Sequence, residues 1–260
     1  MIQKHIHIIS KVGGRFVLLG VDLGNVNTKT SENVLIKSKY TEKEILLGTG
    51  TILELEDKKY CIGEGQLETK LNKTEKRNLL PLLYAAIALS TEDLFNSIVI
   101  GLPPGQYKEN KRRLKEEIPE EVNFKINNFN RKLVIKHLEV FPEGAGAYYS
   151  LSEKPVNCIV TDIGGRTTNI LLFQNGELLK FNTLALGMLN IYSEISISLN
   201  NKFCLDLKIE DIESIMENGL FIDGEKANLK FLKNIIEEFL DQLFNELNLN
   251  YPIRTTQVKR

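Results

Sequence analysis

The amino-acid sequence predicts an α/β protein built from two domains. Apolar runs with strand character alternate along the chain with longer segments of helical periodicity. One short pattern occurs twice, near the N-terminus and past the middle: an apolar strand ends in an aspartate and turns through glycine into small polar residues. A length of 260 residues is enough for one large or two modest domains. The repeated pattern favours two.

The second copy of this pattern begins with the apolar run Cys158–Val160. An aspartate, two glycines and hydroxyl residues follow, and another apolar run starts at Ile170. This order predicts a β-hairpin, and a plain hairpin with a Gly-Gly turn is the alternative without function. Glycine lets the backbone approach an anion, and successive N–H groups of a turn bind one. The candidate phosphate-binding residues are Asp162, Gly164, Gly165, Arg166, Thr167 and Thr168.

The first copy starts with the apolar run Phe16–Val21 and returns along residues 30–37. Two such hairpins, one in each domain, are suited to grip a polyphosphate from both sides of a cleft. A carboxylate does not face phosphate unaided, so Asp22 and Asp162 imply a Mg²⁺ ion held through water. The candidate phosphate-binding residues of this copy are Asp22, Gly24, Asn25, Asn27 and Lys29.

Local patterns assign the elements between the two copies. Gly50–Gly63 alternates on both sides of a polar turn, which predicts a second β-hairpin. The polar run Glu68–Asn78 is expected to be a solvated loop. Pro81 is expected to open a buried helix that reaches Leu89. Residues 97–105 form a short buried strand that ends in a forced turn.

A helix and two strands then lead to an acidic residue that follows a proline. The helix Lys108–Glu117 carries a group of four cations balanced by glutamates, which favours a solvated face over a nucleic-acid patch; the group is Lys111, Arg112, Arg113 and Lys115. Strands at 123–126 and 133–135 precede Glu143, which is expected to stand at a helix start. An acid in the first turn complements the helix dipole by about 0.3–1 kcal/mol. This structural role of Glu143 does not exclude a role for its carboxylate in a reaction.

The last third of the sequence is expected to be mostly helical. Asn175 and Gly176 mark a tight turn after the second hairpin. Apolar residues at 189, 192, 195 and 199 share one helical face, and Ile209–Met216 is a short helix closed near Gly219. Apolar residues from 229 to 247 predict an amphipathic helix. Its apolar stripe is expected to face the core, because the spacing is not a strict heptad.

Composition excludes several classes of protein. Hydrophobic residues make up 42% and charged residues 26%, and the formal net charge is −1, so no overall field indicates nucleic acid or a membrane surface. Cys61, Cys158 and Cys204 lie far apart, without ligand spacing, and are expected to be reduced and structural. No apolar run is long enough to cross a membrane, and the N-terminus lacks the order of a signal peptide.

The paired hairpins resemble the two phosphate motifs of the actin-like ATPase superfamily. The Tyr-x-Ile-Gly-Glu sequence at 60–64, and Gly-Leu-Pro at 101–103 followed by Tyr107, are similar to the plasmid-segregation actins of the ParM/StbA type. The resemblance implies an actin-like, ribonuclease H-like duplicated fold around a nucleotide cleft. It places an N-terminal extension at residues 1–15, one domain at 16–155 with a small subdomain at about 38–78, and a second domain at 156–260.

The same resemblance implies an activity and partners. The protein is expected to bind ATP or GTP with Mg²⁺ and to hydrolyse it, with Glu143 orienting the attacking water. Nucleotide-dependent filaments are expected in the cytoplasm, and an adaptor protein is expected to join them to plasmid or phage DNA. Direct binding to nucleic acid or to a membrane is not expected.

The sequence departs from this family pattern in three places. Asn169 stands where relatives often carry aspartate, and Arg166 replaces a common glycine. The chain stops at Arg260, before the Gly-Gly-Gly adenosine motif that the family places after its long helix. The sequence is therefore also compatible with a C-terminally truncated, catalytically impaired remnant that acts as an interaction protein.

Overall fold

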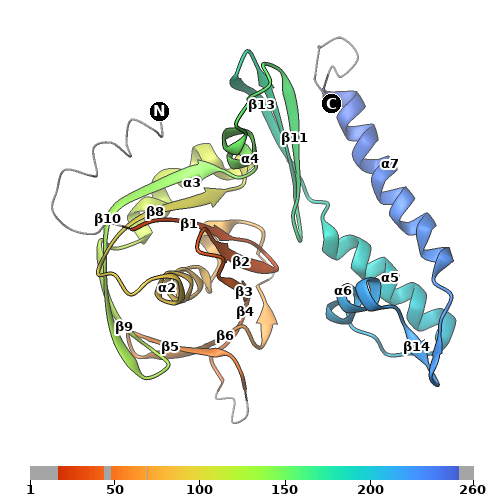
Figure 1. The fold of residues 1–260 in the computed structure, drawn as a ribbon, viewed down its shortest axis with the longest axis horizontal. Helices are drawn as coiled ribbons and strands as arrows, with labels where there is room; N and C mark the ends of the chain where they lie inside the picture. Colours follow the sequence, from red (N-terminus) through yellow and green to blue (C-terminus); the bar gives the residue numbers. More distant parts are fainter. Residues whose placement is uncertain (1–16, 44–47, 69, 252–260) are drawn as a thin grey trace. The chain divides into compact units, whose positions relative to one another are not determined.

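The protein is described by a computed structural model that covers residues 17–43, 48–68 and 70–251. The proposed N-terminal extension, residues 1–15, lies outside the described residues. The chain falls into two compact units, Met1–Gly146 and Ala147–Arg260. Figure 1 shows a sheet wrapped around a helix in the first unit, and a small sheet with several helices in the second.

The first unit is organised by one mixed sheet. Its central strands, β1 (Val17–Leu23), β8 (Phe95–Leu102) and β10 (Phe129–Pro142), are parallel neighbours, and the pairings outside them are antiparallel. Across the sheet the described strands are β3 (Leu35–Lys37), β2 (Asn27–Thr30), β1 (Val17–Leu23), β8 (Phe95–Leu102), β10 (Phe129–Pro142), β9 (Glu121–Ile126), β5 (Thr51–Leu55), β6 (Lys58–Ile62), β4 (Lys39–Thr41) and β7 (Gln66–Leu67). The hairpin predicted within Gly50–Gly63 is present as β5 and β6.

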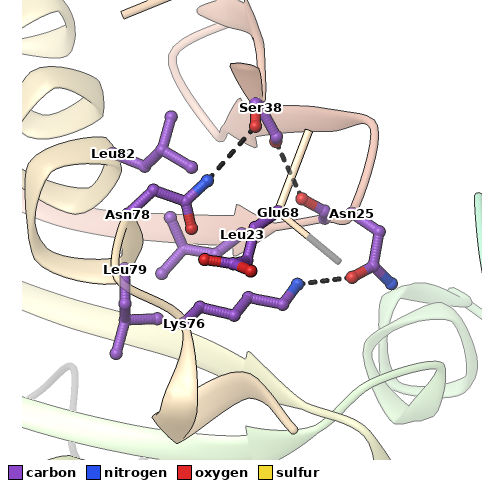
Figure 2. Close-up of a pocket in the computed structure, with 9 residues that line it drawn as sticks. Leu23, Asn25, Ser38, Glu68, Lys76, Asn78, Leu79 and Leu82 are labelled. Atoms are coloured by element: carbon purple, nitrogen blue, oxygen red, sulfur yellow. Dashed lines mark hydrogen bonds between the residues drawn. The ribbon is translucent and has the colours of Figure 1, made fainter. Parts of the chain in front are cut away.

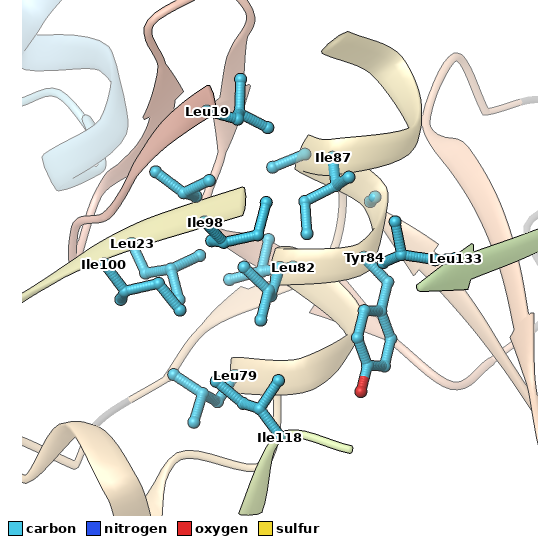
Figure 3. Packing of buried hydrophobic residues seen from close by; sticks show 14 of the residues in the cluster. Leu19, Leu23, Leu79, Leu82, Tyr84, Ile87, Ile98, Ile100, Ile118 and Leu133 are labelled. Atoms are coloured by element: carbon cyan, nitrogen blue, oxygen red, sulfur yellow. The ribbon is translucent and has the colours of Figure 1, made fainter. Parts of the chain in front are cut away.

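Helix α2 (Leu79–Ser90) fills the inside of this curved sheet (Figure 1). It is apolar around most of its circumference, as a helix buried on all sides must be. Figure 3 shows Leu82 and Ile87 of α2 packed against Ile98 and Ile100 of β8. The helix begins two residues before Pro81, in agreement with the tolerance of proline in a first turn.

Helix α3 (Pro104–Glu117) follows β8 and carries the predicted group of four cations. Arg112 and Arg113 pair with glutamates one turn further along the helix. Lys111 and Lys115 both reach Glu139 of β10. Each of the four cations therefore has an acidic partner, which is typical of a solvated, salt-bridged face.

The second unit combines a three-stranded antiparallel sheet with helices. β12 (Thr168–Gln174) lies between β11 (Cys158–Ile163) and β13 (Glu177–Leu184), and six of its seven residues are buried. The helices, and the short strands between them, are α5 (Met188–Phe203), α6 (Ile209–Asn218), β14 (Phe221–Ile222), β15 (Glu225–Lys226), η2 (Lys230–Leu232) and α7 (Lys233–Asn250). A short helix, α4 (Ala145–Ser150), precedes the sheet.

Helix α7 packs with two different parts of the second unit. Phe239 joins the core formed by α5 and α6, whereas Leu243 and Leu247 pack against Ile170 and Leu172 of β12. The apolar stripe predicted for this helix thus faces the core. On β12, Phe173 stacks on Tyr148 of α4, with ring centroids 3.9 Å apart.

Candidate functional site

The first hairpin places its polar residues at the end of β1. Asp22 lies directly opposite Lys29 across the β1–β2 pair, so the carboxylate and the ammonium project from neighbouring positions of one face. Both side chains are exposed. A Cβ atom on Gly24 would lie 2.4 Å from the carbonyl oxygen of Asn27, so this turn accepts only glycine. The structure therefore brings together Asp22, Gly24, Asn25, Asn27 and Lys29, and their contact with nucleotide stays a prediction.

The second hairpin repeats this arrangement in the other unit. Asp162 lies opposite Asn169 across the β11–β12 pair. The N–H of Gly164 donates to the carbonyl oxygen of Thr167 at 2.8 Å and closes the turn. Thr168 is fully buried, and its hydroxyl donates to the carbonyl oxygen of Leu186 at 2.6 Å. This candidate set is also assembled locally, and its contact with phosphate likewise stays a prediction.

Asn169, the departure from aspartate noted in the sequence, has a structural place. It is 2% exposed, and its Oδ1 accepts a hydrogen bond from the hydroxyl of Thr183 at 2.9 Å. An amide suits this position because a buried carboxylate would carry a larger desolvation cost. Asn169 therefore belongs to the β12–β13 pairing, while Asp162 on the neighbouring strand is exposed.

Glu143 does not begin a helix, and that expectation is wrong. Strand β10 runs through Pro142, the N–H of Glu143 donates to the carbonyl oxygen of Leu102 at 2.7 Å, and α4 starts only at Ala145. The carboxylate instead forms an ion pair with Lys73, at 2.5 Å between Nζ and Oε1. The backbone is extended and not helical at this point because the pairing of β10 with β8 continues to Pro142.

Comparison with known proteins identifies the fold. Residues 20–146 match the family model described as the actin-like proteins N-terminal domain. The fold is actin-like. This confirms the resemblance seen in the sequence and the predicted fold class. Among curated proteins, none matches the chain.

Solved structures of other actin-like proteins resemble this one over most of its length. Ta0583, an archaeal actin homolog in complex with ADP, is 18% identical, with 93% of this chain and 84% of that chain covered and a TM-score of 0.78. Apo ParM of psk41 is 17% identical, covers 92% and 81% of the two chains and has a TM-score of 0.63. The filament structure of AlfA from B. subtilis plasmid pLS32 is 18% identical, covers 82% and 92% and has a TM-score of 0.57.

The first turn of this actin-like protein is held by Ser38, a residue outside the set predicted from the sequence. Ser38 is 2% exposed, and its hydroxyl donates to the carbonyl oxygen of Gly24 at 2.8 Å and also lies 2.9 Å from the hydroxyl of Thr28. Its N–H donates to the carbonyl oxygen of Val26. The only sequence signal was a small hydroxyl residue directly after β3.

The segment predicted to be a solvated loop, residues 68–78, also supports this turn. Its described residues form a loop with one short helix, but Lys73, Thr74 and Asn78 are buried, so the expected solvation is wrong for that part. Figure 2 shows Lys76 donating a hydrogen bond to Oδ1 of Asn25, and Asn78 donating to the carbonyl oxygen of Ser38. Asn78 is 2% exposed. Lys76 is therefore a second lysine at the first turn, in addition to Lys29. The burial of part of the segment was not predicted because its composition is polar.

The second turn is held by the start of α5. The N–H groups of Met188 and Leu189 donate to the carbonyl oxygens of Gly164 and Gly165 at 2.9 and 2.8 Å. A Cβ atom on Gly187 would lie 2.7 Å from backbone atoms of Arg166, so this close approach requires glycine. The first N–H groups of a helix have no partner within the helix. Here two of them fix the hairpin turn.

Within residues 17–43, 48–68 and 70–251, no group of three or more His, Cys, Asp or Glu side chains is arranged to hold a metal ion. Mg²⁺ is often bound by one or two carboxylates together with substrate phosphates and water, and exposed Asp22 and Asp162 fit that mode. No helix in the described part of the chain has the length and apolar character needed to span a membrane.

Proposed function

We propose that this actin-like protein binds ATP or GTP with Mg²⁺ and hydrolyses it. The observation that carries the proposal is the pair of hairpins, one in each unit. Each hairpin has an exposed aspartate near the end of its first strand. Each also has a glycine turn that is fixed by hydrogen bonds from outside the turn, donated by Ser38 in the first unit and by the start of α5 in the second. Two turns built for close approach to an anion favour a polyphosphate ligand. The ADP complex of Ta0583 shows that an actin homolog of similar fold binds a nucleotide.

The residues have separate roles in this proposal. Asp22 and Asp162 hold Mg²⁺ through water, and the ion neutralises part of the phosphate charge. Lys29 and the N–H groups of the two turns contact phosphate oxygens, and Arg166 and the hydroxyl of Thr167 complete the second set. Thr168 contributes by holding the turn, because its hydroxyl is buried and donates to the carbonyl oxygen of Leu186. Glu143 orients the attacking water, because phosphoryl transfer depends mainly on positioning and electrostatic stabilisation.

We further propose that nucleotide binding drives self-association into filaments in the cytoplasm. Two of the structures similar in fold, AlfA bound to AMPPNP and Alp12, are filaments. A further filament structure is of AlfA from the B. subtilis plasmid pLS32. These likenesses support plasmid or phage DNA segregation as the role, with an adaptor protein joining the filament to DNA. Without hydrolysis, the protein would instead be an impaired actin-like remnant that binds a partner, which is the alternative.

A sedimentation assay distinguishes filament formation from the alternative. The protein is expected to pellet at high speed when ATP or GTP and Mg²⁺ are added, and to stay in the supernatant without nucleotide or in EDTA. Release of inorganic phosphate is measured in the same samples. If neither pelleting nor phosphate release depends on nucleotide and Mg²⁺, the result favours the alternative, an impaired actin-like protein that binds a partner.

The variant Asp162→Ala is expected to weaken nucleotide binding by about tenfold or more in Mg²⁺, and by less than about twofold in EDTA. The reason is that the carboxylate acts through the ion, and an interaction with a charged group contributes about 1.5–3 kcal/mol. Titration calorimetry in the two buffers measures both affinities. Asp241→Ala, at an exposed aspartate of α7, is the matched control. Equal weakening in both buffers would show that Asp162 shapes the hairpin only.

A further inference from the structure

Lys73 is a buried lysine in a stretch of sequence that looks solvated. It begins the short helix η1 (Lys73–Glu75), and its side chain is only 3% exposed. Lysine is almost never buried this far without a partner. Its Nζ donates hydrogen bonds to Oε1 of Glu143 at 2.5 Å and to the carbonyl oxygen of Gly101 at 2.8 Å. The ammonium therefore joins the ends of β8 and β10.

Gly101 adds a second constraint on the same carboxylate. A Cβ atom at this position would lie 2.8 Å from Cγ of Glu143, closer than real side chains allow. Because Glu143 is also held by Lys73, its side chain has little freedom to move aside. Gly101 thus supplies an acceptor for Lys73 and the space that Glu143 occupies.

The backbone that carries Lys73 is anchored to α3. The N–H of Lys73 donates to Oε1 of Gln106 at 2.9 Å, and Nε2 of Gln106 donates to the carbonyl oxygen of Leu71 at 2.9 Å. One helical turn further, Asn110 donates to Oδ1 of Asn72, which also accepts from the backbone N–H at position 74. These contacts fix the position of the lysine before it meets the carboxylate.

We propose that Lys73 is a positioning residue for hydrolysis, which holds the carboxylate of Glu143 in one orientation toward the attacking water. The proposal rests on the proposed function, in which Glu143 orients that water. A misplacement of about 1 Å in a reacting geometry costs about 100-fold in rate. An anchored ammonium on one carboxylate oxygen prevents such displacement. Lys73 then affects turnover through Glu143, without contact between Lys73 and the nucleotide.

The test compares turnover with nucleotide affinity in single and double variants. Lys73→Met is expected to lower kcat about tenfold or more while nucleotide Kd stays within about twofold. In a Glu143→Ala background, the added Lys73→Met change is expected to cause no further loss of kcat, because residues that act as a unit are not additive. A purely structural role would lower kcat in both backgrounds alike, and would overturn the proposal.

A second variant keeps the test decisive if Lys73→Met does not fold, as judged by circular dichroism. Gln106→Ala removes the anchor of the Lys73 backbone and leaves both charges in place, and a fall in kcat of about threefold is expected at unchanged Kd. Lys108→Met, an exposed neighbour on α3, is the control and should match the wild type. A wild-type kcat in every folded variant of Lys73 and Gln106 overturns the proposal.

The same data separate this proposal from the proposed function. If Glu143→Ala loses turnover while folded Lys73→Met and Gln106→Ala retain it, Glu143 keeps its role and only the role of Lys73 is wrong. If Glu143→Ala hydrolyses nucleotide at the wild-type rate, or the wild type does not hydrolyse it, both proposals are wrong.

Discussion

Replacing Glu143 with alanine is expected to lower kcat for nucleotide hydrolysis by about 100-fold or more, with nucleotide Kd within about twofold of the wild type. The loss of one preorganised group that acts in the transition state has effects of this size. Affinity is expected to persist because the phosphate contacts assigned to the two hairpins do not involve Glu143. Phosphate release under single-turnover conditions, together with titration calorimetry, measures the two quantities separately.

The matched variant for this prediction is Glu143→Gln. Glutamine keeps an oxygen that can accept the hydrogen bond from Lys73 Nζ, and an amide can also orient water in phosphoryl transfer. Glu143→Gln should therefore retain more turnover than Glu143→Ala. Wild-type turnover in Glu143→Ala would leave Glu143 with its structural pairing to Lys73 and no part in hydrolysis.

Replacing Lys73 with methionine is expected to lower the free energy of unfolding of the first unit by about 3 kcal/mol, because removing one partner of a buried ion pair leaves the other charge uncompensated. The Glu143 side chain is 17% exposed, so water can solvate part of the remaining carboxylate. We therefore expect a loss of stability at the lower end of the range of about 3–5 kcal/mol that is found when a buried ion pair is broken. Urea denaturation followed by circular dichroism, with and without the substitution, measures the change.

The double variant Lys73→Met/Glu143→Met tests the cause of this loss. Replacing both charges with apolar side chains of similar size is often neutral or stabilising, so most of the lost stability should return. Lys108→Met on the exposed face of α3 should change stability by no more than about 0.5 kcal/mol. If the double variant is as unstable as Lys73→Met, the ion pair does not explain the loss of stability. The loss then comes from other contacts of the Lys73 side chain.

Elements governed by local pattern could be predicted from the sequence. The hairpin within Gly50–Gly63 follows from alternating apolar residues around a polar turn, and the helix that ends before Gly219 follows from its periodicity and its stop signal. The two hairpins with the Asp-x-Gly pattern were recognisable for the same reason, since each is closed by residues a few positions apart. The candidate phosphate-binding residues cluster within each hairpin as a direct result.

Predictions failed where long-range packing decides the environment of a polar residue. The polar run 68–78 was expected to be solvated, yet Lys73 and Asn78 are each 2% exposed. Lys73 lies 28 residues from Gly101 and 70 residues from Glu143 along the chain, so no local window contains the pair. The expected helix start at Glu143 failed in a similar way, because pairing with β8 extends β10 through Pro142.

The sequence by itself determined the α/β class, the actin-like order of motifs and the two glycine turns, because hydrophobic period and turn chemistry act over short stretches of chain. Only the tertiary structure decided what holds those turns and the Glu143 carboxylate in place. Ser38, Gly187 and Lys73 act through contacts that form when distant segments pack together. A buried polar group gains its partner only in the folded chain, and the desolvation cost of leaving it unpaired selects the arrangement that satisfies it.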